Sequence, residues 1–176
     1  MLGCGNSRLG EEMVGDDGGG WKGPIIQVDI SGRVIESMSH RCHDLVTQGK
    51  ISFVQDDACE LSAFRDSAVD ACLDKGLIDA IYLADEVDQL GRILKSVGRV
   101  LKPGSSFVFF SFSRPEFLLP RLMKDEMADI RRRTWTNVQV QELEKILLYK
   151  MQKADTPRNE RLRSRTNRIR NDKFRK

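Results

Sequence analysis

Short apolar runs recur along the first two thirds of the chain. They are rich in β-branched and aromatic residues, and polar residues do not alternate regularly within them, which is typical of strands buried on both faces. We therefore expect strands at residues 24–29, 51–54, 68–73 and 106–112. Acidic residues lie at or just past three of these strand ends: Asp29, Asp57 and Asp74.

Between these runs, apolar residues are spaced as on one face of a helix. This spacing predicts helices at residues 7–13, 32–46, 85–101 and 117–127. Ser31 can cap the second helix, and Lys102-Pro103-Gly104 should end the third. Residues 136–140 and 146–151 can form a closing antiparallel pair around a loop at 141–145, although a helix fits this stretch equally well.

The alternation of strands and helices predicts an α/β fold. Successive units of this kind form right-handed crossovers and a largely parallel sheet covered on both faces. Ligands of such sheets bind at the carboxyl ends of the strands. The three acidic residues at strand ends should therefore gather at one edge of the sheet.

Composition excludes several classes of protein. With 176 residues, 40% of them hydrophobic, the chain can form one α/β domain, and no apolar run approaches the roughly 18 residues of a membrane helix. The glycine-rich, acidic start is unlike a secretory signal. A reducing, cytoplasmic setting fits the cysteines, which form no CxxC pair: Cys4, Cys42, Cys59 and Cys72. His40, Cys42 and His43 lack a fourth ligand at recognisable spacing, so we expect no metal.

The charge is distributed unevenly. From Asp155 onward there are nine Lys and Arg residues against three Asp and Glu residues, with almost no apolar side chains. We expect a domain over residues 1–154 and a disordered basic tail over 155–176. Such a tail can bind RNA, an acidic partner or a nuclear import receptor, which would make the nucleus an alternative location.

A glycine turn opens the chain. Gly3 and Gly5 let the backbone approach a ligand closely, and Asp29, 24 residues after Gly5, can accept hydrogen bonds from both hydroxyls of a ribose. A dinucleotide fingerprint would need glycine where Arg8 stands, and the next glycine is Gly10. The pattern favours a nucleoside without a pyrophosphate over a dinucleotide.

Four motifs together resemble one family. LGCGNS at the start, VDIS at 28–31, LDKGLIDA at 73–80 and VLKPG at 100–104 occur in this order and at these intervals. They are similar to motifs of the class I, seven-strand methyltransferases that include the elongation factor 1-alpha lysine methyltransferases and the mitochondrial citrate synthase lysine methyltransferase. LDKGLIDA is the most diagnostic, and the resemblance extends to about residue 153.

The resemblance implies a Rossmann-like sheet, S-adenosylmethionine as cofactor and methyl transfer to a lysine of a protein such as an elongation factor or a metabolic enzyme. Asp29 would hold the ribose, and Asp57 the adenine amine, with Asp56 as an adjacent competitor. Asp74 would lie beside the methyl group and orient the incoming ammonium. The remaining cofactor residues would be Gly3, Cys4, Gly5, Asn6, Ile30, Ala58 and Lys75, with Gly76 beside the reacting groups.

The chain departs from the family at its start. Only Met1 and Leu2 precede Gly3, so we expect a sheet truncated before or within its first strand, without the aromatic segment that closes over the cofactor. A transit segment upstream would instead make the location mitochondrial. An alternative function is a catalytically impaired module of the same fold that binds RNA or a protein through the basic tail.

Overall fold

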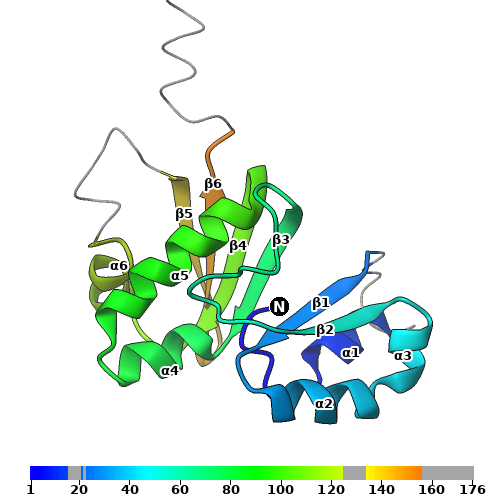
Figure 1. Cartoon of the computed structure of the whole chain (residues 1–176). Helices are drawn as coiled ribbons and strands as arrows, with labels where there is room; N and C mark the ends of the chain where they lie inside the picture. The colour runs from blue at the N-terminus through cyan, green and yellow to red at the C-terminus, as the bar shows by residue number, and fades with distance from the viewer. Residues whose placement is uncertain (16–20, 22, 125–133, 156–176) are drawn as a thin grey trace, which may run out of the picture.

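The computed structural model describes residues 1–15, 21, 23–124 and 134–155 (Figure 1). The expected tail from residue 156 and the end of the helix expected at 117–127 lie outside these ranges. The helices are α1 (Leu9–Val14), α2 (Gly32–Arg41), α3 (His43–Thr47), α4 (Leu77–Leu83), α5 (Val87–Val100) and α6 (Pro115–Leu122). The strands are β1 (Ile25–Asp29), β2 (Ile51–Gln55), β3 (Val69–Lys75), β4 (Leu101–Ser111), β5 (Trp135–Leu143) and β6 (Ile146–Lys153).

The chain forms two sheets, and Leu2 lies between them and connects them through backbone bridges. Strand β1 pairs with β2 in parallel, and the second sheet has the order β3-β4-β6-β5. In the second sheet β3 and β4 are parallel, whereas β6 is antiparallel to both β4 and β5. Leu2 forms parallel bridges to Val28 in β1 and to Asp74 in β3. The α/β class is confirmed. The described chain has six strands, with Leu2 alone at the position between β1 and β3.

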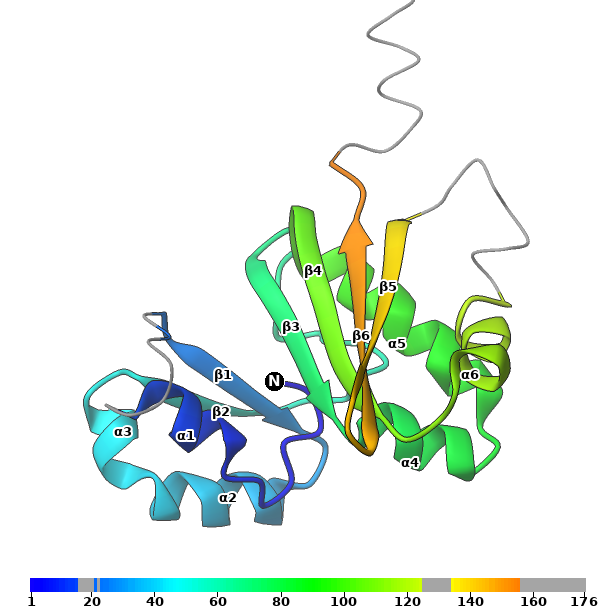
Figure 2. The same cartoon turned by 180° about the vertical axis from the view of Figure 1, so that it is seen from behind.

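The helices divide between the two sheets. Helices α4, α5 and α6 lie on one face of the four-stranded sheet, nearest the viewer in Figure 1, and α1, α2 and α3 pack with β1 and β2. Figure 2 shows that no described helix covers the opposite face of β3-β4-β6-β5. The expectation of helices on both faces is therefore wrong for this part of the described chain. The main core lies under α5, where Phe107, Phe109 and Tyr149 are fully buried.

Two predicted helices differ from the observed ones. The helix expected at 32–46 is broken at Cys42 into α2 and α3, although Ser31 does cap it, accepting a hydrogen bond from Val34 N at 3.4 Å. Helix α4 was not predicted. It begins directly after β3, with Gly76 at its N-cap in the left-handed region (φ 107°).

The last strands are longer than predicted. Strand β4 already begins at Leu101, and β5 continues to Leu143, so the expected loop at 141–145 shrinks to a tight turn with Glu144 at φ 52°. The helical alternative for this stretch is wrong. No helix in the described ranges is long and apolar enough to cross a membrane.

Candidate functional site

The glycine turn lies where the two sheets meet, beside the carboxyl ends of β1 and β3. Gly3 and Gly5 both have positive φ, 53° and 49°. A Cβ on Gly3 would lie 2.9 Å from the Cβ of Leu77, so the turn packs closely against α4. A Cβ on Gly5 would meet nothing within 4 Å, so this side of the turn is open to a ligand.

Arg41 holds the turn from outside. Its guanidinium donates to the backbone oxygens of Asn6 and Ser7, each at 3.1 Å, and pairs with Glu11. Sequence reasoning did not identify this residue, because an arginine at the end of a helix has no local pattern that points to a loop 35 residues away. Cys4 is buried in the same turn. Burial and the neighbouring Asp29 raise the pKa of its thiol to about 11, so it remains protonated at neutral pH.

Asp29 is held by two backbone amides. Gly5 N donates to Oδ2 and Ser31 N to Oδ1, both at 2.9 Å. Each carboxylate oxygen can accept two hydrogen bonds, so each keeps one further acceptor position. Ile30 follows and is 68% exposed, so its apolar side chain is available for contact with a ligand.

The two adjacent acids after β2 have different environments. Asp56 accepts from Asp57 N and Ser62 Oγ on one oxygen and from Ala63 N on the other. Asp57 accepts from Cys59 N on Oδ1, and the Cys59 thiol is also hydrogen-bonded to its carboxylate. Asp56 therefore accepts three hydrogen bonds from its own loop, whereas the carboxylate of Asp57 is bonded only by Cys59, through its backbone N–H and its thiol, and keeps more acceptor capacity.

Ala58 points into the protein. Its side chain is buried in the core, and its carbonyl oxygen accepts from Ser96 Oγ at 2.5 Å. Any contact from this residue to a ligand must therefore use its backbone N–H group.

Asp74 is fully buried at the end of β3 and caps α4. Leu77 N donates to Oδ1 at 2.8 Å and Ile78 N donates to Oδ2 at 3.1 Å. Burial raises the pKa of this carboxyl to about 6, and nearby Asp79 adds to the rise, while the hydrogen bonds from Ile78 and Leu77 oppose it. Lys75, next in the chain, is exposed.

Asp79 is a second acid of this region to which the sequence assigned no role. Its Oδ1 atom accepts from the hydroxyl of Ser111 and, at 3.4 Å, from that of Ser113, and its Oδ2 atom accepts from Phe112 N at 2.9 Å. Asp79 thus ties α4 to the carboxyl end of β4. Its place in LDKGLIDA was the available signal, but the motif alone does not separate a structural acid from a functional one.

The structure thus gathers most of the predicted residues along one sheet edge. Gly5 N donates a hydrogen bond to the Asp29 carboxylate, and Leu2, just before the turn, forms a parallel backbone bridge to Asp74. A family model described as a methyltransferase domain matches residues 2–156. The chain belongs to this methyltransferase family. The family implies S-adenosylmethionine as cofactor, as the sequence resemblance did.

Relatives of this methyltransferase domain are considerably longer. This chain is 32% identical over 121 residues to the eEF1A lysine and N-terminal methyltransferase of Bos taurus. The aligned stretch covers 67% of this chain and 16% of the Bos taurus protein. The Mus musculus protein of the same name is 34% identical with the same coverage. The chain therefore spans about a sixth of the length of these relatives.

Solved structures agree on the fold. A SAM-dependent methyltransferase from Methanosarcina mazei superposes with a TM-score of 0.54 and 20% identity, covering 87% of this chain and 90% of that one. The CurJ carbon methyltransferase superposes with a TM-score of 0.62 and 12% identity, and the match covers 87% of this chain and 47% of that one. At such identities the likeness concerns the fold alone.

Proposed function

We propose that this domain binds S-adenosylmethionine at the carboxyl ends of β1, β2 and β3 and transfers its methyl group to the side-chain amine of a protein lysine. The observation that carries this proposal is the carboxylate of Asp29. Two backbone amides, from Gly5 and Ser31, fix its orientation, and each oxygen keeps an acceptor position for one ribose hydroxyl. A carboxylate held in this way is ready to bind two neighbouring hydroxyls without rearranging.

Adenine would lie between exposed Ile30 and the loop after β2. The Asp57 carboxylate, which is bonded only by Cys59, can accept from the exocyclic amine, and Ala58 N–H can donate to a ring nitrogen. The bonding of Asp56 to its own loop favours Asp57 over Asp56 for this role. The apolar face of Ile30 would gain burial from the ring, which is a favourable exchange for a side chain that is 68% exposed.

The methionine end would lie against Gly3, Cys4, Gly5 and Asn6, with the reacting groups near Asp74. When bound, S-adenosylmethionine would supply an activated methyl group on a sulfonium, which a neutral amine could accept with thioether as the leaving group. The incoming lysine must first lose its proton. With a pKa of about 6, Asp74 is ionised at neutral pH and attracts the ammonium to this edge. Its two bonds to α4 favour an orienting, electrostatic role over proton abstraction.

The lysine substrate is supported by the names of the relatives, which act on eEF1A lysine and N-terminal amines. LDKGLIDA, the most diagnostic motif, is present in full. Asp74 and exposed Lys75 would flank the entering amine. We therefore propose a protein with an accessible lysine, eEF1A among them, as the partner of this domain.

Two measurements test the function in order. Isothermal titration with S-adenosylmethionine should give micromolar binding to the folded chain. Tritiated cofactor is then incubated with eEF1A, and the hydrolysed protein is analysed for methylated lysine, with N-terminally acetylated eEF1A as the matched control. Label on lysine in both proteins supports the proposal, whereas label lost on acetylation points to the N-terminal amine. Absence of cofactor binding in the folded chain refutes the enzyme and favours a binding module.

A further inference from the structure

Helix α4 presents an apolar side to solvent. Ile78 packs into the core, whereas the exposed residues of the helix are Ala80 and Leu83, followed by Ala84 at its end. Leu83 is 80% exposed. A helix at the surface of a globular protein normally carries charged or polar residues on its outer side. The one charged residue within α4 is Asp79, whose carboxylate is bonded to the segment after β4.

An exposed aromatic ring lies beside this side of the helix. Phe112 follows β4 and is 73% exposed. Its backbone N–H donates to Oδ2 of Asp79 at 2.9 Å. Leu83 comes four residues after Asp79 and therefore lies one turn further along the same side of α4. Phe112 and Leu83 thus border the same stretch of surface.

A second aromatic ring reaches this surface from α6. The guanidinium of Arg121 lies 5.0 Å from the centroid of the Tyr82 ring and is paired with Asp85 at 2.9 Å. This side of α6 therefore faces the last turn of α4. Phe117, one turn before Arg121 on the same side, is 64% exposed. We define the α4 patch as the exposed apolar residues Ala80, Leu83, Ala84, Phe112 and Phe117.

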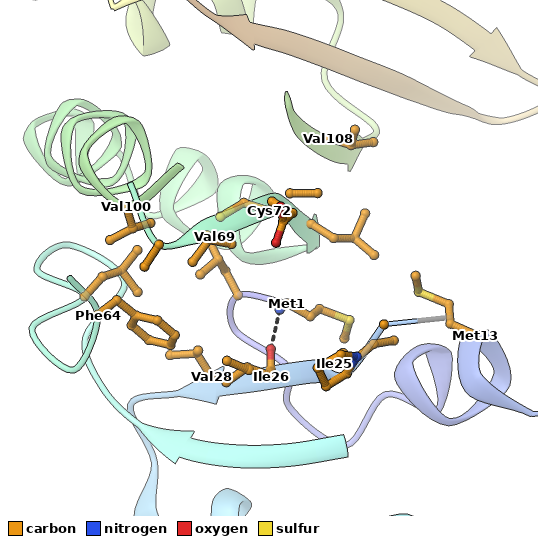
Figure 3. A pocket seen from close by; sticks show the side chains of 18 of the residues that line it. Met1, Met13, Ile25, Ile26, Val28, Phe64, Val69, Cys72, Val100 and Val108 are labelled. Carbon is orange, nitrogen blue, oxygen red and sulfur yellow. Dashed lines mark hydrogen bonds between the residues drawn. The ribbon is translucent and has the colours of Figure 1, made fainter. Parts of the chain in front are cut away.

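The α4 patch begins at the proposed methyl-transfer site. Gly76 is the N-cap of α4, and Asp74 accepts from Leu77 N in its first turn. Because a helix rises ~1.5 Å per residue, Leu83 lies ~10 Å from Gly76 along the axis. No residue of α4 lines the cavity of about 530 Å³ between β1 and β3 that Figure 3 shows. A protein that brings its amine to Asp74 would therefore lay its neighbouring surface on α4, which lies at the lower edge of the molecule in Figure 1.

The charge around the patch indicates what kind of surface it fits. Residues 77–89 contain four acidic residues and no Lys or Arg: Asp79, Asp85, Glu86 and Asp88. Asp79 and Asp85 are bonded within the domain, whereas Glu86 and Asp88 are exposed and pair with no Lys or Arg among the described residues. Acidic side chains at the border of an apolar patch attract a partner that carries basic residues.

We infer that the α4 patch docks the protein that receives the methyl group. It selects a partner with an apolar side chain, flanked by Lys or Arg, about 10 Å from the target amine. In an extended segment this distance corresponds to about three residues at ~3.3 Å each. An exposed apolar patch with a charged border is typical of protein–protein contact sites. The inference rests on the proposed methyl transfer and adds to it the surface that chooses the substrate.

The test measures kcat and KM for transfer of tritiated methyl groups from S-adenosylmethionine to eEF1A. We expect Leu83→Ser and Phe112→Ser each to raise KM for eEF1A about tenfold, because each removes an apolar side chain that the partner would bury. The kcat value and the cofactor Kd should stay within twofold, since the lost contact is the same before and during the reaction. Glu86→Gln should raise KM about threefold.

Val46→Ser on α3 is the matched control, because Val46 is an exposed apolar residue remote from α4, and its KM should stay within twofold of the parent value. Rates count total methyl transfer, so they report docking for a lysine and an N-terminal amine alike. An active parent whose KM is unchanged by Leu83→Ser and Phe112→Ser, or equally raised by Val46→Ser, overturns this inference and leaves the proposed function standing. A parent that transfers no methyl group refutes the proposed function, and this inference with it. If light scattering shows a dimeric parent and a monomeric Leu83→Ser variant, the patch binds a second copy instead, and the inference is wrong.

Discussion

Replacing Asp74 with asparagine should stabilise the protein, and only above a defined pH. Burial raises the pKa of this carboxyl from 3.8 to about 6, so the folded protein holds its proton more tightly than the unfolded chain. Between those pH values the native state binds more protons, and the unfolding free energy falls as pH rises. A shift of the pKa from 3.8 to about 6 corresponds to a loss of about 3 kcal/mol in the free energy of unfolding when Asp74 is ionised. This loss is complete above pH ~7 and absent below pH ~4.

The opposing effect is loss of the helix cap. Asp74 accepts from Leu77 N and Ile78 N, and asparagine can accept only one of these bonds through its single oxygen. A cap is worth about 1 kcal/mol. The raised pKa already includes these hydrogen bonds, so burial of the charge outweighs them. We expect Asp74→Asn to gain about 2–3 kcal/mol at pH 7.5.

Urea unfolding of both proteins at pH 4, 5, 6 and 7.5 measures the difference in their free energies of unfolding. The other titrating groups are the same in both proteins, so their contributions cancel in this difference. The gain should grow across pH 4–6 and level off above pH 7. An Asp74→Asn protein that is less stable than its parent at pH 7.5, by an amount independent of pH, would refute the reasoning and make Asp74 a net-stabilising cap. Methyl transfer should fall in the same variant, since the charge that attracts the ammonium is gone.

Three further changes test the site and the domain boundary. Asp29→Ala should weaken S-adenosylmethionine binding by one to two decades, a loss of about 1.5–3 kcal/mol for a charged acceptor, which isothermal titration would show. Asp57→Asn should weaken cofactor binding about tenfold with little change in melting temperature, whereas Asp56→Asn should lower the melting temperature and largely spare binding; the reverse pattern would exchange their roles. Removal of residues 155–176 should leave cofactor affinity within twofold, and a folded but non-binding short chain would contradict the predicted boundary.

The sequence predicted the buried strands well because each forms a short apolar run between turn residues. The extra length of β4 was hidden by Pro103, which normally excludes a strand. The pairing of β3 with β4 shifts register between Val69 and Ala71, so Pro103 lies in an irregular stretch where no ladder donor is needed. Composition alone does not reveal such a bulge.

Helix α4 was not predicted because its sequence has no amphipathic spacing that distinguishes a helix from a strand. Seven residues are too few for a stable isolated helix, and its sequence, LIDAIYL, is as apolar as a strand. Its stability comes from tertiary contacts, chiefly the fully buried Ile78 and the cap from Asp74. The places of Asp29 at the end of β1 and of Asp57 after β2 were predictable from the apolar runs before them, whereas the contact of Arg41 with the glycine turn depends on folding and was not.

These contacts show what the LDKGLIDA motif does in the fold. Asp74 caps α4 at its first turn, Asp79 ties the helix to buried Ser111 at the end of β4, and Leu77 packs so closely on Gly3 that a methyl group there would lie 2.9 Å from its Cβ. The motif therefore fixes one helix to the ends of β3 and β4 and to the glycine turn at once, and the turn and the end of β3 belong to the proposed cofactor site. A substitution that relaxes this junction would move several site residues together. The motif is first a structural junction, and for this reason it indicates the fold and the cofactor more firmly than it indicates which amine receives the methyl group.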